Sequence, residues 1–186
     1  IPPDLALIAC VRCADAWALS MHNKPWHTTP ELQSLEFGEF IRAEWDTVVD
    51  RPRYFEKTAP LDTIGQPLQH DRDPLTGARF ANLFALRRAK LTGLLSYLQR
   101  DCTVILLRME DAQNAPEITL DALRAGLGLP PRDSDFAPVL KRLGSKFKPA
   151  VEGRPATPRK MGAFGVKFMR KHLDLAQEAA LGYTYD

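Results

Sequence analysis

The sequence predicts an α/β fold in which helices flank a parallel sheet. Two apolar runs without polar alternation, residues 5–11 and 103–107, are typical of strands buried on both faces of such a sheet. Two stretches of helical periodicity separate these runs, and a third follows the second run. Strand, helix, helix, strand, helix is the order that parallel sheets with crossover helices produce.

The first half of the chain carries two further element signals. A short helix is predicted over residues 15–22, before Pro25 ends it. The apolar residues between Phe37 and Val49 recur at helical spacing, with a helix-start signal at residues 29–31, and predict an amphipathic helix that ends near Asp50.

Residues 51–79 contain repeated proline and glycine, so we expect a long irregular excursion, and loops of this length are commonly functional. Residues 80–99 show the strongest helical pattern in the chain. A helix is also expected over residues 118–127, where Gly128 stops the pattern.

Length and composition predict one soluble domain over residues 1–186, with 45% hydrophobic and 26% charged residues. No run approaches the roughly 20 apolar residues of a membrane helix. An odd count of three cysteines favours a reducing, cytoplasmic setting. Cys10 and Cys13 form a C-x-x-C pair, but no second pair completes a zinc site, so we expect no metal.

Positive charge is concentrated late in the chain. Residues 141–171 carry ten basic side chains and one acidic one, whereas residues 1–140 carry 15 basic and 19 acidic. Such a block is either a solvated face or a cover for an anionic ligand. Nucleic acid is the least favoured ligand, since few aromatic residues interleave the charges and no known motif is present.

Arg12 and Ser20 form the most informative spacing. Arg12 falls at the carboxyl end of the first predicted strand, where open α/β sheets bind ligands, and Ser20 lies eight residues later on the following helix. A guanidinium and a hydroxyl suit a phosphate. From spacing alone the favoured interpretation is another one: an arginine that ends a strand and pairs with a nearby carboxylate such as Asp15, with Ser20 merely lying on a helix.

The strand, Arg12 and Ser20 resemble the phosphosulfate-cofactor motif of the sulfotransferase family, in which these two residue types hold a nucleotide 3′-phosphate. Further stretches resemble bacterial sulfotransferase-like proteins in the same order: residues 17–21, 73–77, 82–90 and 103–111. The terminal segment, residues 173–183, is also similar to the family, and the resemblance implies that it forms a closing helix. The resemblance implies the sulfotransferase type of the P-loop nucleotide-binding fold.

Arg159, Lys160 and Gly162 resemble the family's Arg-Lys-Gly loop, which covers the same 3′-phosphate. The family's first strand and phosphosulfate loop are not found in the sequence, so the resemblance implies that both, with the usual catalytic base, lie upstream of Ile1. Cys13 and Ala14 stand where the family has proline in the turn.

The implied function is transfer of a sulfuryl group from 3′-phosphoadenosine 5′-phosphosulfate (PAPS) to a hydroxyl or amine of a small-molecule or carbohydrate acceptor. A catalytically inactive nucleotide- or partner-binding module of the same fold is the alternative. His22 is a weak candidate for the base, as is His27, because imidazole titrates near neutrality. Glu56 and Lys57 are candidates for acceptor contacts, although a solvated pair is the favoured interpretation.

Overall fold

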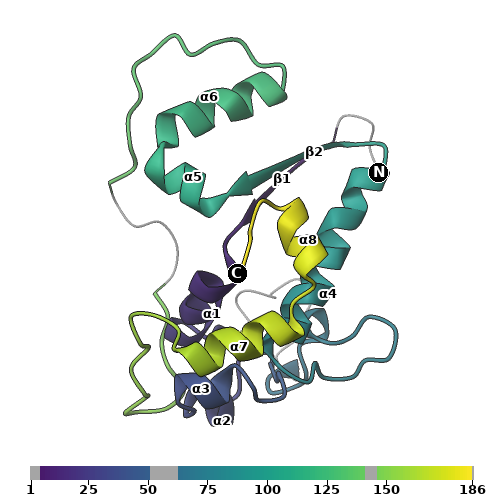
Figure 1. Ribbon diagram of the computed structural model, residues 1–186, viewed down its shortest axis with the longest axis vertical. Coiled ribbons are helices and arrows are strands. Elements are labelled where there is room, and N and C mark those ends of the chain that lie inside the picture. The colour runs from purple at the N-terminus through teal and green to yellow at the C-terminus, as the bar shows by residue number, and fades with distance from the viewer. Residues whose placement is uncertain (1–4, 51–62, 141–145, 186) are drawn as a thin grey trace. The chain divides into compact units, whose positions relative to one another are not determined.

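The computed structural model describes residues 5–50, 63–140 and 146–185, which divide into two compact units (Figure 1). Unit 1 holds the described residues of 1–13, 91–145 and 175–186, and unit 2 holds those of 14–90 and 146–174. Each unit is therefore assembled from separate segments of the chain.

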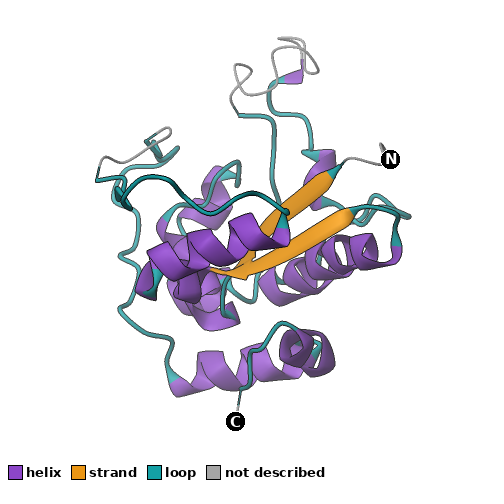
Figure 2. Cartoon of the chain, turned by 90° about the horizontal axis from the view of Figure 1, so that it is seen from above, coloured by secondary structure: helices purple, strands orange, loops and turns teal. Residues whose placement is uncertain are grey.

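The sheet of unit 1 is parallel, as predicted. Among the described residues it consists of β1 (Ala6–Val11) and β2 (Thr103–Arg108), in a register that runs from Ala6↔Thr103 to Val11↔Arg108. The two strands lie side by side in Figure 2, where they are drawn in orange. The chain is thus a mixed α/β protein, and both apolar runs form the strands expected of them.

The expectation that the first strand is buried on both faces is wrong. Ala6, Ile8 and Cys10 are exposed along β1, whereas Val11 at its end is buried. The exposed residues alternate along the strand with half-buried ones, so the described part of the chain covers one face of β1 and leaves the other open.

Helices α5 (Met109–Asn114), α6 (Pro116–Gly126) and α8 (Leu175–Ala180) belong to unit 1. Helix α6 confirms the pattern over residues 118–127, and α8 is a shorter form of the predicted closing helix. Buried apolar residues of unit 1 form one cluster, made of Val11, Leu91, Leu181 and Tyr183.

Unit 2 contains α1 (Ala14–Asn23), α2 (Pro30–Gln33), α3 (Phe37–Phe40) and α7 (Ala163–His172), and α1 packs on α3 and α7. Helix α4 (Leu83–Leu95), continued by a 3₁₀ helix at Ser96–Gln99, confirms the predicted helix over 80–99. Residues 83–90 of α4 belong to unit 2 and residues 91–95 to unit 1. Residues 15–22 also form the expected helix, as part of α1.

The predicted helix from Phe37 to Asp50 is wrong beyond its first turn. Helix α3 ends at Phe40, and Trp45, Thr47 and Val48 instead form isolated bridges to extended segments. Trp45, Thr47 and Val49 are buried while Glu44 is exposed, which is the two-residue period of a strand. Apolar spacing over so short a stretch fits both periods, and β-branched residues favour the extended one.

Part of the predicted excursion over residues 51–79 lies outside the described residues, including Glu56 and Lys57. Its described part holds a 3₁₀ helix at Gln69–Asp71 and a turn. In that turn Asp73 Oδ1 accepts the backbone N–H of Thr76 at 2.9 Å, and the Gly77 N–H bonds to the Asp73 carbonyl. Gly77 has φ 71°, a left-handed conformation that glycine adopts without a steric penalty.

Candidate functional site

The carboxyl ends of the two strands define the candidate site of unit 1. Val11 and Arg108 pair at the last register position, so the residues that follow them, Arg12 and Glu110, leave the same edge of the sheet. Open α/β sheets bind their ligands outside this edge. Arg12 is half-buried at the position where the sequence placed it.

Glu110, in the first turn of α5, connects this edge to the C-terminal segment. Its Oε1 accepts the Cys13 backbone N–H at 3.0 Å, and its Oε2 accepts the Tyr183 hydroxyl at 2.8 Å. Desolvation acts to raise the pKa of Glu110, but the hydrogen bonds from Cys13 and Tyr183 outweigh it and lower the pKa to about 2. The carboxylate is therefore charged at any physiological pH.

Tyr183 is the counterpart of Glu110. It is buried, and its hydroxyl also lies 3.3 Å from the Val11 carbonyl oxygen. Burial, and the hydrogen bond to the charged Glu110, raise the pKa of this phenol well above its ordinary value. The hydroxyl remains a proton donor throughout the working pH range.

Arg108 covers the other side of Tyr183. Its guanidinium lies 4.8 Å from the centroid of the Tyr183 ring, a cation–π distance, and its Nε lies 3.9 Å from an Asp111 carboxylate oxygen. Hydrogen bonding to Tyr183 and the neighbouring carboxylates raise the pKa of Arg108. Within the described residues the buried Nε has no hydrogen-bond partner.

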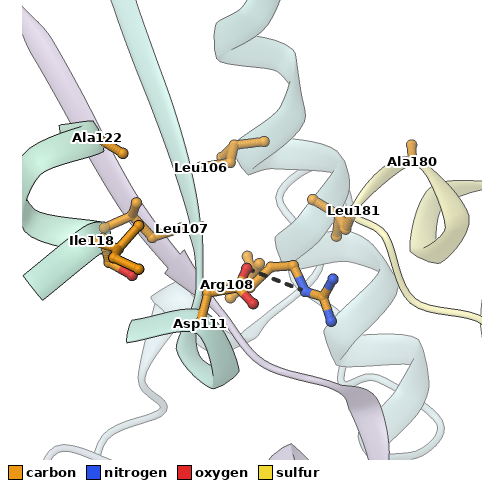
Figure 3. A pocket seen from close by; sticks show the side chains of 10 residues that line it. Leu106, Leu107, Arg108, Asp111, Ile118, Ala122, Ala180 and Leu181 are labelled. Carbon is orange, nitrogen blue, oxygen red and sulfur yellow. Dashed lines mark ion pairs between the residues drawn. The ribbon is translucent and has the colours of Figure 1, made fainter. Parts of the chain in front are cut away.

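A cavity of about 360 Å³ opens beside Arg108, entirely within unit 1. Figure 3 shows Leu107, Ile118 and Ala122 on one side of it and Leu181 on the other, with Arg108 and Asp111 joined by an ion pair between them. Its walls are mainly apolar, and its charged groups come from the end of β2 and the start of α5. A mainly apolar cavity with a few polar groups at one end is typical of sites for small ligands.

The remaining residues predicted to bind the cofactor belong to the other unit. Arg12 lies in unit 1, whereas Ser20, Arg159, Lys160 and Gly162 lie in unit 2. Ser20 is exposed on α1, seven residues into the helix. Convergence of Arg12 and Ser20 on one phosphate stays a prediction.

Lys160 and Gly162 share a hollow of about 460 Å³ in unit 2. Phe37 and Ile41 contribute apolar walls to it, and Arg42 adds a second cation. Gly162 is the N-cap of α7. Arg159 is exposed and precedes Lys160 in the sequence. Neither Ser20 nor Arg159 is among the residues that line the hollow.

His22 is fully buried in unit 2 and both of its ring nitrogens are occupied. Nδ1 lies 2.7 Å from Thr157 Oγ1, and Nε2 lies 3.0 Å from the Leu35 carbonyl oxygen. Burial is the main cause of a lowered pKa, which keeps the ring neutral. The ring joins the 150–158 segment to α1, and this contact describes a structural histidine better than a catalytic base.

His27 pairs with Asp50 at 2.6 Å through Nδ1 and has a positive φ of 65°. Neither Cys10 nor Cys13 forms a disulfide among the described residues, and partial desolvation of the Cys10 thiol, followed by the nearby Glu110, raises its pKa. Within residues 5–50, 63–140 and 146–185, no group of three or more His, Cys, Asp or Glu could hold a metal ion.

The Glu110–Tyr183 contact is what sequence reasoning missed. Glu110 and Asp111 follow the second strand in the sequence, but no local pattern links Glu110 to Tyr183, 73 residues later.

Among the described helices, none has both the length and the apolar composition needed to cross a membrane. The chain matches no family model, no curated protein and no solved structure. The assignment that fold and site carry directly is therefore that of a mixed α/β protein with a polar site at the carboxyl edge of a parallel sheet.

Proposed function

We propose that the chain is a sulfotransferase-like enzyme of the P-loop nucleotide-binding fold. It would bind PAPS through its 3′-phosphate and transfer the sulfuryl group to a hydroxyl or amine of a small-molecule or carbohydrate acceptor. Arg12 is the principal anchor of the phosphate, and Ser20, Arg159, Lys160 and Gly162 complete the phosphate site.

The observation that carries the proposal is the order strand, arginine, helix. Strand β1 ends at Val11, Arg12 follows immediately at the carboxyl edge of a parallel sheet, and α1 begins at Ala14 and carries Ser20. The resemblance to the sulfotransferase motif rests on this succession, and the described secondary structure is compatible with it.

The chemistry asked of the chain is binding and orientation. In the proposed reaction, the acceptor oxygen or nitrogen attacks sulfur, the bond from sulfur to the bridging phosphate oxygen breaks, and the acceptor proton passes to a base. In-line transfer of this kind is promoted by fixing the two reactants and by stabilising negative charge on the leaving phosphate. The cations of the proposed site serve the first of these purposes, because by holding the 3′-phosphate they fix the nucleotide in place.

Calorimetry with adenosine 3′,5′-bisphosphate tests the proposal. We expect Arg12→Ala to weaken binding by about 1.5–3 kcal/mol, or about 10- to 150-fold, because hydrogen bonds to a charged phosphate are lost. The matched control is Arg100→Ala, which removes an exposed arginine stacked on Tyr97 in the same unit. Equal affinity of the Arg12 variant and the wild type would remove Arg12 from the site.

The alternative, an inactive nucleotide- or partner-binding module, is separated by a second assay. The gene product, including any residues encoded upstream of Ile1, is incubated with PAPS labelled in the sulfuryl group and a panel of hydroxyl and amine acceptors. Transfer of label supports the enzyme. Nucleotide binding without transfer to any acceptor supports the module.

A further inference from the structure

Two peptide groups flank the Arg12 Cα atom, and both are held by one pair of side chains. The peptide before Arg12 presents the Val11 carbonyl oxygen, 3.3 Å from the Tyr183 hydroxyl. The peptide after it presents the Cys13 N–H, which donates to Glu110 Oε1 at 3.0 Å. Rotation about φ of Arg12 turns the first peptide relative to Cα, and rotation about ψ turns the second.

Glu110 and Tyr183, the two side chains that contact these peptides, are also hydrogen-bonded to each other. Tyr183 donates to Glu110 Oε2 at 2.8 Å, so one carboxylate uses one oxygen for the Cys13 N–H and the other for Tyr183. The phenol has a single proton, which it shares unequally between two acceptors: the shorter contact is to Glu110, and the longer one is to the Val11 carbonyl oxygen. A charged acceptor strengthens both bonds that it receives.

Packing restrains the ring of Tyr183. Tyr183 belongs to the buried cluster of unit 1, and the Arg108 guanidinium stacks on its ring. Gly182 precedes Tyr183 with φ 80°, and a Cβ built there would lie 3.3 Å from Arg108 Nη1. The tyrosine ring therefore has little freedom to move away from the carboxyl ends of the strands.

We infer that Glu110 and Tyr183 are positioning residues, which fix the backbone dihedrals of Arg12 and thereby aim its guanidinium at the anionic ligand. The inference rests on the proposed function, because it takes Arg12 as the phosphate anchor. It gives the segment after α8 a role in ligand binding, although that segment need not touch the ligand.

A double-mutant cycle in calorimetry with adenosine 3′,5′-bisphosphate tests this inference. We expect Glu110→Gln to weaken binding about 5- to 30-fold and Tyr183→Phe about 3- to 10-fold, since each loosens a hydrogen bond that orients Arg12. In the Arg12→Ala background, Glu110→Gln should change the affinity by less than about 2-fold, because there is no guanidinium left to aim.

Glu117→Gln is the matched control, because it removes one negative charge from the same unit at an exposed position. It should leave the affinity within about 2-fold of the wild type. The Cys13 amide resonance gives an independent readout that a general loss of stability does not mimic. It should shift in Glu110→Gln while the amides of α6 stay in place.

The outcomes separate the two proposals. If Arg12→Ala weakens binding but Glu110→Gln and Tyr183→Phe bind as the wild type does, the positioning role is wrong and the proposed function stands. If Arg12→Ala has no effect, the proposed function fails first. An equal loss from Glu110→Gln with and without Arg12 also overturns the inference. Should Glu110→Gln fail to fold, Tyr183→Phe, which keeps the buried ring, decides the matter alone.

Discussion

The two units differ in how many apolar side chains they bury. Among the described residues, unit 1 buries four apolar side chains, whereas unit 2 buries fifteen, including Phe40, Trp45 and Phe84 with no exposed surface. Unit 1 carries Arg12, the principal proposed anchor, and beside it the hydrogen bonds that Glu110 accepts from Cys13 and Tyr183. The comparison indicates that polar contacts matter for the geometry of the candidate site, since apolar packing in unit 1 is sparse.

The largest expected effect concerns the aromatic core of unit 2. Phe40 is fully buried and packs edge-to-face on Trp45 at 5.6 Å and on His22 at 5.0 Å. We expect Phe40→Ala to lower the free energy of unfolding by about 3–5 kcal/mol, because it removes a large apolar group and leaves a cavity. Urea unfolding followed by tryptophan fluorescence measures this, since Trp17, Trp26 and Trp45 all lie in unit 2.

Phe164→Ala is the control, because Phe164 is 84% exposed in the same unit. It should change the stability by less than about 0.5 kcal/mol. A loss below about 1 kcal/mol for Phe40→Ala would contradict the view that unit 2 is held by its aromatic core.

Lowering the pH is expected to have an intermediate effect on the stability of unit 1. The pKa of Glu110 falls from its ordinary 4.5 to about 2 on folding, so its charged form stabilises the folded unit above about pH 4.5. That contribution is lost as the pH falls from 4.5 to about 2. Allowing for solvent screening at this half-buried group, we expect about 1–2 kcal/mol.

Amide exchange of β1 and β2 between pH 5 and pH 3 measures this loss, after correction for the intrinsic pH dependence of exchange. Glu110→Gln should flatten the dependence, and Glu117→Gln should leave it largely unchanged. An equally steep pH dependence without the Glu110 carboxyl would assign the acid sensitivity to other groups.

The smallest effect is expected near neutrality in unit 2. Burial lowers the pKa of His22 in the folded state. As the pH drops below about 6.5, the unfolded chain therefore takes up a proton before the folded one does, and the free energy of unfolding decreases. Between pH 7 and pH 6 this amounts to less than about 1 kcal/mol. His22→Gln should reduce that dependence in tryptophan-monitored unfolding, whereas the exposed His70→Gln should not.

The elements predicted correctly from the sequence are those whose residue pattern fits one type of secondary structure. Both strands and α4 were predicted because continuous apolar runs and a long amphipathic period are unambiguous. Sequence reasoning failed at Trp45, Thr47 and Val49, where the burial period of two is set by bridges to residues distant in sequence. It also missed α7, because residues 163–172 lie largely within the basic segment 141–171, which was interpreted from its charge and not from its periodicity.

In the candidate site, too, local features were predicted and tertiary contacts were not. The position of Arg12 at a strand end follows from local pattern and is confirmed. The burial of His22, and the contact of Glu110 with Tyr183, depend on partners from other segments. These contacts are tertiary, so no spacing rule in a single sequence predicts them.

The strand register has a kinetic consequence. Ala6 pairs with Thr103, and Tyr183 must reach the end of the same two strands before the Arg12 backbone is fixed. Contacts that join distant segments form slowly because a long stretch of chain must first be ordered. During synthesis most of unit 2 emerges before unit 1 can close, so the nascent chain would complete the carboxyl edge of its sheet, with the candidate site, last.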